Sequence, residues 1–244
     1  MRGGSGSSST AAGLWSAGQY TAFIKERALE HLAESPFVLR VMADALPRLG
    51  QGDGGSRGAN SRPRLITQAH VFEAFLEAWW EKEQGRLWKQ PPTGLPADFD
   101  AGRSYANYGQ DLAVEMLARG QLAAESTAGL YVRGGLARSP WTRFFKQTPV
   151  IAAARQGVPL RQSGRMCSFV HKSIAEYMAA CAMWEEVLAV MEEFGGLAFT
   201  PGELSGMAGV TSSVVKGLVK QGVLVEEEAP RDEPFPALDP DMPG

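Results

Sequence analysis

Apolar residues recur along most of this chain at spacings of three and four, which is the period of an amphipathic helix. Ser35, followed by Pro36, and Thr67 are residue types that commonly begin helices. A short strand over 165–170 and a small hairpin within 120–135 add a few β residues. We therefore predict a mainly α chain with short β-strands, whose helices cover residues 19–34, 35–49, 67–89, 104–117 and 171–194, with a shorter one from 139.

Residues 200–228 have the pattern of a helix-turn-helix followed by a wing. Residues 200–203 form a T-x-x-E capping box with proline at the first helical position. A tight turn at 209–210 separates this helix from a second one that begins at Thr211. Alternation over 223–228 then predicts a strand. Helix, turn, helix and strand in this order indicate a winged helix-turn-helix.

Charge divides the chain into two parts. Residues 1–184 hold 21 Lys and Arg against 15 Asp and Glu, a net charge of about +6. Residues 185–244 hold 3 Lys and Arg against 12 Asp and Glu, about −9, and the two parts add to the −3 of the whole chain. An asymmetry of this size predicts two units with different partners, joined near residue 185.

The domains we predict are a helical bundle and winged-helix domains between two tails. They are a flexible tail over 1–18, a helical domain over 19–103, a winged-helix-like domain over 104–184, a helix-turn-helix winged domain over 185–229 and an extended acidic tail over 230–244. Cys167 and Cys181 give no disulfide framework, which indicates a reducing compartment. With no secretory signal and no apolar run of about 20 residues, we expect a cytoplasmic protein without membrane contact.

Three segments carry a resemblance to a known family. They are residues 35–40 (SPFVLR), 66–81 (from Ile66-Thr67 to Trp79-Trp80-Glu81) and 169–180 (FVHKSI and the following helix). In these segments, residues 19–184 resemble the helical and winged-helix region of NACHT-type STAND NTPases. The resemblance implies that Pro36 packs near the adenine, and that His171 reaches the diphosphate in a closed ADP state. An imidazole at a helix start suits this role, since it can donate to phosphate where the helix dipole favours anions.

The chain lacks the parts that such an ATPase needs for hydrolysis. It contains no G-x-x-x-x-G-K-[ST] loop to hold the phosphates, and no acidic strand to position Mg²⁺. We therefore expect no cofactor for this chain alone. ATP or ADP would be contacted only beside an ATPase core, supplied by another polypeptide or by a missing N-terminal portion.

Residues 185–244 resemble a second family, the winged-helix domain of primosomal protein N′, the replication-restart helicase. Matching segments include 201–204, 208–210, 213–222 and the acidic 230–234. The helicase core and its zinc-binding cysteines are absent from the chain. The resemblance implies DNA contact, with the phosphates touched by residues of the second helix: Ser212, Ser213, Lys216 and Lys220. This unit has only two lysines on that helix and a net charge of about −9, so we expect it to bind DNA weakly.

Each candidate also has a purely structural interpretation. His171 can simply cap its helix, Pro36 can simply begin one, and the two lysines can simply solvate a face. Trp79 and Trp80 fit a core, or else a binding surface.

No nucleophile–base pair and no metal-ligand spacing stands out, so we expect no enzyme activity. The first function hypothesis is a non-catalytic regulatory or interaction module whose partner is a protein, either an ATPase core or an oligomer. The alternative is a DNA-associated module of replication restart. A third possibility is that the two parts have no function apart from their parent enzymes.

Overall fold

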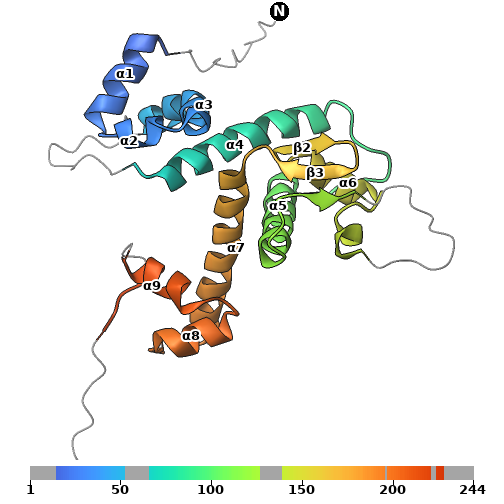
Figure 1. Cartoon of the computed structure of the whole chain (residues 1–244). Helices are drawn as coiled ribbons and strands as arrows, with labels where there is room; N and C mark the ends of the chain where they lie inside the picture. The colour runs from blue at the N-terminus through green and yellow to red at the C-terminus, as the bar shows by residue number, and fades with distance from the viewer. Residues whose placement is uncertain (1–14, 53–65, 127–138, 196, 221–223, 228–244) are drawn as a thin grey trace, which may run out of the picture. The chain divides into compact units, whose positions relative to one another are not determined.

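The computed structural model describes residues 15–52, 66–126, 139–195, 197–220 and 224–227 (Figure 1). Helices predominate among these residues, and three short strands form one antiparallel sheet, which confirms the predicted fold class. The chain divides into two compact units, Met1–Ala182 and Met183–Gly244. Each unit has a hydrophobic core of its own.

The first unit begins with helices and ends with a sheet and a long helix. Its elements are α1 (Ala17–Glu26), α2 (Glu30–Ala33), α3 (Pro36–Gly52), α4 (Gln68–Leu87), α5 (Ala101–Ala118), β1 (Ala124–Glu125), the 3-10 helix η1 (Pro140–Arg143), α6 (Pro149–Gln156), β2 (Leu160–Ser163) and β3 (Met166–Phe169). The boundary between the units falls within α7 (Lys172–Glu193). The second unit continues with α8 (Pro201–Met207) and α9 (Ser212–Lys220).

Two predicted helix starts form reciprocal capping boxes. Thr67 accepts from the backbone N–H of His70, whose Nδ1 in turn accepts from the Thr67 N–H at 3.1 Å. Thr200 accepts from the N–H of Glu203, whose carboxylate accepts from the Thr200 N–H at 2.8 Å. Each box satisfies backbone donors that a helix start leaves without partners. Both starts are therefore confirmed at the residues the sequence indicated.

The single helix predicted over residues 19–34 is wrong. Ala28 has a φ of +52°, and the chain breaks there into α1 and α2. The Ala28 N–H bonds to the Lys25 carbonyl at 3.2 Å, and the Leu29 N–H bonds to the Ile24 carbonyl at 2.9 Å. These two bonds make a Schellman ending, which usually has glycine at the left-handed position. An alanine there gives the sequence no stop signal.

A proline inside α3 is compensated from α1. Pro47 has no N–H, so it cannot donate to the carbonyl of Ala43 one turn earlier. The hydroxyl of Tyr20 donates to that carbonyl instead, at 2.6 Å. The bond ties α1 to α3, and α3 runs through its proline to Gly52, past the predicted end at residue 49.

The sheet has the order β1-β3-β2 and is antiparallel throughout. Ala124 pairs with Cys167, so β1 joins the predicted strand β3. Residues 127–135 of the hairpin expected within 120–135 lie outside the described part. Arg161 on β2 pairs with Ser168 on β3, and the side chains of both residues are at least partly exposed.

Other predictions differ from the structure in their boundaries. Asp100 caps α5, four residues before the predicted start at Ser104, because its carboxylate accepts from the Arg103 N–H at 3.0 Å. Helix α6 and strand β2 were not predicted. The strand expected over 223–228 is absent from its described part, residues 224–227.

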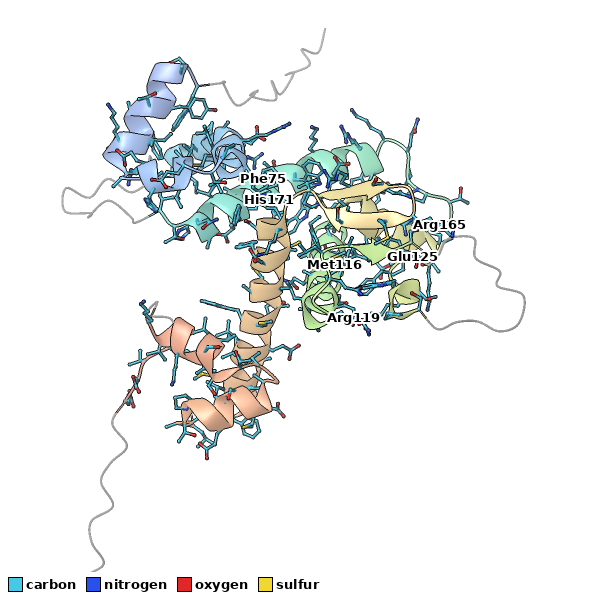
Figure 2. All side chains as sticks on the ribbon, viewed as in Figure 1. Phe75, Met116, Arg119, Glu125, Arg165 and His171 are labelled. Carbon is cyan, nitrogen blue, oxygen red and sulfur yellow. The ribbon has the colours of Figure 1, made fainter. Side chains whose placement is uncertain are left out.

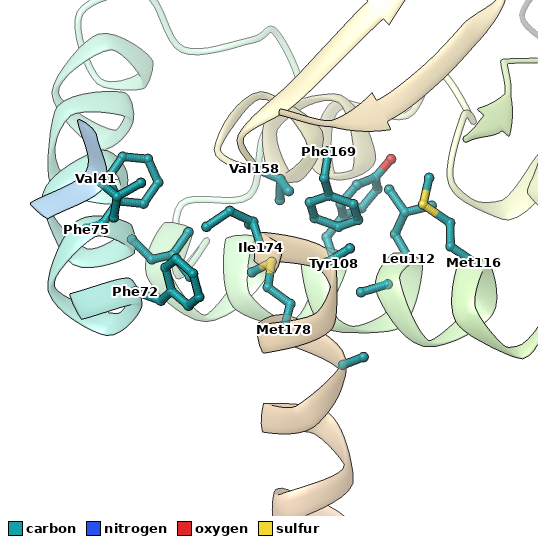
Figure 3. Packing of buried hydrophobic residues seen from close by; sticks show 14 of the residues in the cluster. Val41, Phe72, Phe75, Tyr108, Leu112, Met116, Val158, Phe169, Ile174 and Met178 are labelled. Atoms are coloured by element: carbon teal, nitrogen blue, oxygen red, sulfur yellow. The ribbon is translucent and has the colours of Figure 1, made fainter. Parts of the chain in front are cut away.

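The core of the first unit joins the sheet to helices from both ends of the unit (Figure 3). Buried side chains come from α3, α4, α5, β3 and α7, among them Val41, Phe72, Phe75, Leu112, Met116, Phe169, Ile174 and Met178. The Tyr108 hydroxyl donates to the Phe144 carbonyl at 2.9 Å within this core. A smaller core in the second unit consists of Val187, Leu204, Ala208, Val215 and Leu218.

No helix among the described residues is both long enough and apolar enough to cross a bilayer.

Candidate functional site

The first unit brings together the two helix starts that carry the predicted nucleotide contacts. Phe37, which follows Pro36 at the start of α3, stacks on the ring of His171 just before α7. The ring centroids are 3.8 Å apart and the ring planes lie within 8° of parallel. Figure 2 labels His171 at the beginning of α7. Pro36 and His171 therefore belong to one neighbourhood, although they are far apart in the sequence.

Local hydrogen bonds orient the imidazole of His171. Its Nδ1 accepts from the backbone N–H of Ser173 at 3.1 Å, and its carbonyl accepts from the Ile174 N–H at 3.1 Å. The residue thus caps α7, as the purely structural interpretation expects. Because Nδ1 is an acceptor, we assign the proton of the neutral ring to Nε2. The cap therefore leaves the Nε2–H of this partly buried side chain as a directed donor.

Pro36 lies at the first position of α3 and is exposed. The hydroxyl of Ser35 lies 3.5 Å from the Val38 nitrogen, at the limit of a capping hydrogen bond, and the Ser35 carbonyl accepts from the Leu39 N–H at 2.8 Å. The site thus combines an exposed pyrrolidine ring, a stacked aromatic pair and one imidazole donor. Lys172, next to His171, is paired with Glu176 at 3.1 Å. These groups can contact a nucleotide at one edge, but they cannot surround its phosphates.

The second predicted site lies on α9 of the second unit. Ser213, Lys216 and Lys220 share an exposed face, on the opposite side of the helix from the buried Val215 and Leu218. The Ser213 hydroxyl is bonded to that of Thr211 at 2.8 Å.

Ser212 is exposed like its neighbours, but its hydroxyl lies 3.2 Å from that of Ser205 on α8. The described residues of this unit carry 2 lysines against 7 glutamates, a net charge of −5. The α9 face is therefore accessible but lies in an acidic field.

Trp79 and Trp80 pack against the core of the first unit. Trp79 lies 6.1 Å from Phe75, measured between ring centroids. The indole nitrogens of both tryptophans are buried and have no hydrogen-bond partner among the described residues. Their position agrees with the core interpretation.

A group of arginines in the first unit was not predicted from the sequence. Arg119 at the end of α5, Arg143 in η1 and Arg155 in α6 each place a guanidinium over an aromatic ring. A signal was present in the sequence, since residues 126–175 contain 8 Lys and Arg and no Asp or Glu. We define Arg119, Arg143 and Arg155 as the arginine cluster.

Burial affects two ionisable side chains in the core of the first unit. Burial raises the pKa of the Cys167 thiol, which keeps the weaker, protonated nucleophile at neutral pH. Burial also raises the pKa of the Tyr108 hydroxyl. No group of three potential metal ligands occurs in the described part of the chain. Comparisons of the chain with protein-family models, with curated proteins and with solved structures found no match.

Proposed function

We propose that the first unit is a non-catalytic regulatory module that closes over a nucleotide held by a separate ATPase core. The observation that carries the proposal is the stack of Phe37 on His171. This stack joins the start of α3 to the start of α7, and the exposed Pro36 directly precedes the stacked Phe37. In this proposal His171 donates from Nε2 to a phosphate oxygen, and Pro36 lies against the adenine.

The energy available from this chain explains why a separate core is needed. A hydrogen bond to a charged group contributes about 1.5–3 kcal/mol. A millimolar dissociation constant already requires about 4 kcal/mol. The chain alone is therefore expected to bind ADP more weakly than millimolar. Added to a nucleotide that a core already holds, the same bond favours the closed state by about 10- to 150-fold.

A titration followed by NMR tests the contact directly. The chain has three histidines, so the imidazole signals of a ¹⁵N-labelled sample form a small set. His31 and His70 serve as internal controls, because the Nδ1 of each also engages a local group, at 3.1 Å. ADP and pyrophosphate are expected to shift the His171 signals progressively, and adenosine to shift them much less. Phe37→Leu, which removes the ring stack, is expected to reduce the shift.

Two results would contradict the proposal. Equal shifts at all three histidines would show only a general ionic effect. No shift at His171, at concentrations where weak binding is still visible, would remove the nucleotide contact. Added ATP is not expected to be hydrolysed in either case, because the chain has no phosphate-binding loop.

The second candidate function is DNA contact through α9. It is favoured by the accessible face that holds Ser213, Lys216 and Lys220. The net charge of −5 on the described residues of this unit opposes it, because phosphate binding depends on neutralisation. Binding of a forked DNA that weakens with salt and is lost in Lys216→Glu/Lys220→Glu would support this alternative. Unchanged binding in that variant would exclude it.

A further inference from the structure

The arginine cluster is held in place on three aromatic side chains. The guanidinium carbon of Arg143 lies 4.6 Å from the ring centroid of Phe144. Those of Arg119 and Arg155 lie 5.8 Å from the rings of Trp141 and Phe145, respectively. All three rings belong to one short segment whose aromatic side chains are buried. Cation–π contacts with a fixed support reduce the entropy that these long side chains lose on binding a ligand.

Hydrogen bonds hold all three guanidinium groups, and Glu115 links two of them. The Glu115 carboxylate accepts from Arg119 Nε at 2.5 Å and from Arg143 Nη2 at 3.1 Å. Arg155 Nη1 donates to the carbonyl of Phe144 at 3.4 Å. The four side chains together carry a net charge of +2. Each guanidinium has five N–H groups, so donors remain after these bonds.

Two arginines of the cluster are well exposed and Arg155 is partly buried, and the sheet of the same unit carries two further exposed arginines. The side chains of Arg119 and Arg143 are 44% and 59% exposed, so their charged ends reach water. Arg161, on the outer face of the sheet, and Arg165, at the β2–β3 turn, are also exposed (Figure 2 labels Arg119 and Arg165). Arg143, Arg155, Arg161 and Arg165 belong to residues 126–175, which contain no carboxylates. Arg119 lies outside this stretch and pairs with Glu115, and Glu125 on β1 is also exposed.

We propose that the arginine cluster binds the phosphate backbone of a duplex nucleic acid, without regard to sequence. Arginine forks match phosphate oxygens in pairs, and all three side chains of the cluster are arginines. Duplex DNA presents about one negative charge per 1.7 Å, so it can engage several guanidinium groups of the cluster at once. An acidic protein segment presents fewer charges per length. The inference is independent of the nucleotide contact, since it uses other residues and another ligand.

Fluorescence anisotropy of a labelled duplex with the whole chain tests this inference. Three phosphate contacts give a slope of about −2.7 in log affinity against log salt, which is roughly 40-fold weaker binding at 200 than at 50 mM salt. Arg119→Gln/Arg143→Gln/Arg155→Gln is expected to remove most of this dependence. A matched control is Lys25→Gln/Lys82→Gln/Lys89→Gln, which makes the same charge change at exposed lysines elsewhere and should bind nearly as well as the parent.

A second variant changes binding in the opposite direction, so a folding defect cannot imitate it. Glu115→Gln keeps the shape of the side chain but removes the charge that competes with phosphate for Arg119 and Arg143. It is expected to bind the duplex several-fold more tightly. Equal or weaker binding by this variant would overturn the inference, as would absence of binding at low salt.

The remaining outcomes identify a different binder. Loss of binding in Lys216→Glu/Lys220→Glu, with the cluster variant unchanged, would move the site to α9. Displacement of the duplex by poly-glutamate at equal charge concentration would show that the cluster takes an acidic protein instead. Both outcomes would overturn the proposal.

Discussion

The stack of Phe37 on His171 makes a prediction about stability that can be worked out from its two parts. His171→Ala removes the ring stack, which contributes about 0.5–1.5 kcal/mol. It also removes the side-chain cap on the Ser173 N–H, which contributes about 1 kcal/mol. The expected loss is therefore about 2 kcal/mol, or roughly 4–8 °C in the melting temperature of a unit of this size.

A matched variant separates the two contributions. Asparagine is a good helix cap but has no ring, so His171→Asn should lose only the stack, about 1 kcal/mol. A double-mutant cycle between Phe37→Ala and His171→Ala should show a coupling of about 1 kcal/mol, since the residues are in direct contact. The assay is urea unfolding followed by tryptophan fluorescence. A coupling near zero, or equal losses in the asparagine and alanine variants, would refute the reasoning.

Three further predictions concern the first unit. Tyr20→Phe should cost about 1 kcal/mol of stability in the parent protein. In a Pro47→Ala background it should cost much less, because alanine restores an N–H that can donate to the Ala43 carbonyl. Equal losses in the two backgrounds, measured by urea unfolding, would contradict this. Gly157→Ala should cost about 1–3 kcal/mol of stability, since the added Cβ would meet the buried Tyr105 ring. Gly85→Ala, where the space is open, should gain about 0.5–1 kcal/mol. Shifts of the melting temperature in the same direction for both variants would be evidence against this packing. A hydrogen bond from Arg48 lowers the pKa of the Glu81 carboxyl in the folded protein. The bond therefore stabilises the fold above the pKa that this carboxyl has in the unfolded chain, and the stabilisation is lost as the pH falls through its pKa in the folded protein. Since this carboxylate is largely exposed, Glu81→Gln should cost about 0.5 kcal/mol at neutral pH and nothing in acid, and a loss that persists in acid would exclude the ionic explanation.

Local signals predicted the elements that local chemistry determines. The capping box at Thr200 depends on residues three apart, and the sequence predicted it. Thr67 was predicted only as a helix start, because its partner in the box is His70 and not Glu or Gln. The long helix after His171 has a continuous apolar stripe, and its predicted ends lie within one residue of α7. The break at Ala28 escaped notice because the left-handed position holds alanine in place of glycine. The fold class was predictable for the same local reasons.

The candidate sites depend more on tertiary contacts. The sequence suggested Pro36 and His171 separately. The stack of Phe37 on His171 connects two segments that are distant in the sequence, so local patterns do not predict it. The arginine cluster escaped prediction for a similar reason, because Arg119 and Glu115 come from α5 while Arg143 and Arg155 lie in later elements. Only the carboxylate-free stretch pointed to this region. Sequence alone does not reveal that buried aromatic rings support these charges.

The tautomer of His171 shows whether the ring caps α7 through Nδ1 and keeps its proton on Nε2, as a phosphate contact requires. Long-range ¹H–¹⁵N correlation spectra of the imidazole, at a pH where the ring is neutral, distinguish a protonated Nε2 from a protonated Nδ1. We expect the proton on Nε2, because Nδ1 accepts from the Ser173 N–H. A proton on Nδ1 would rule out the proposed contact, since the ring could then neither cap α7 in this way nor donate from Nε2 to a phosphate.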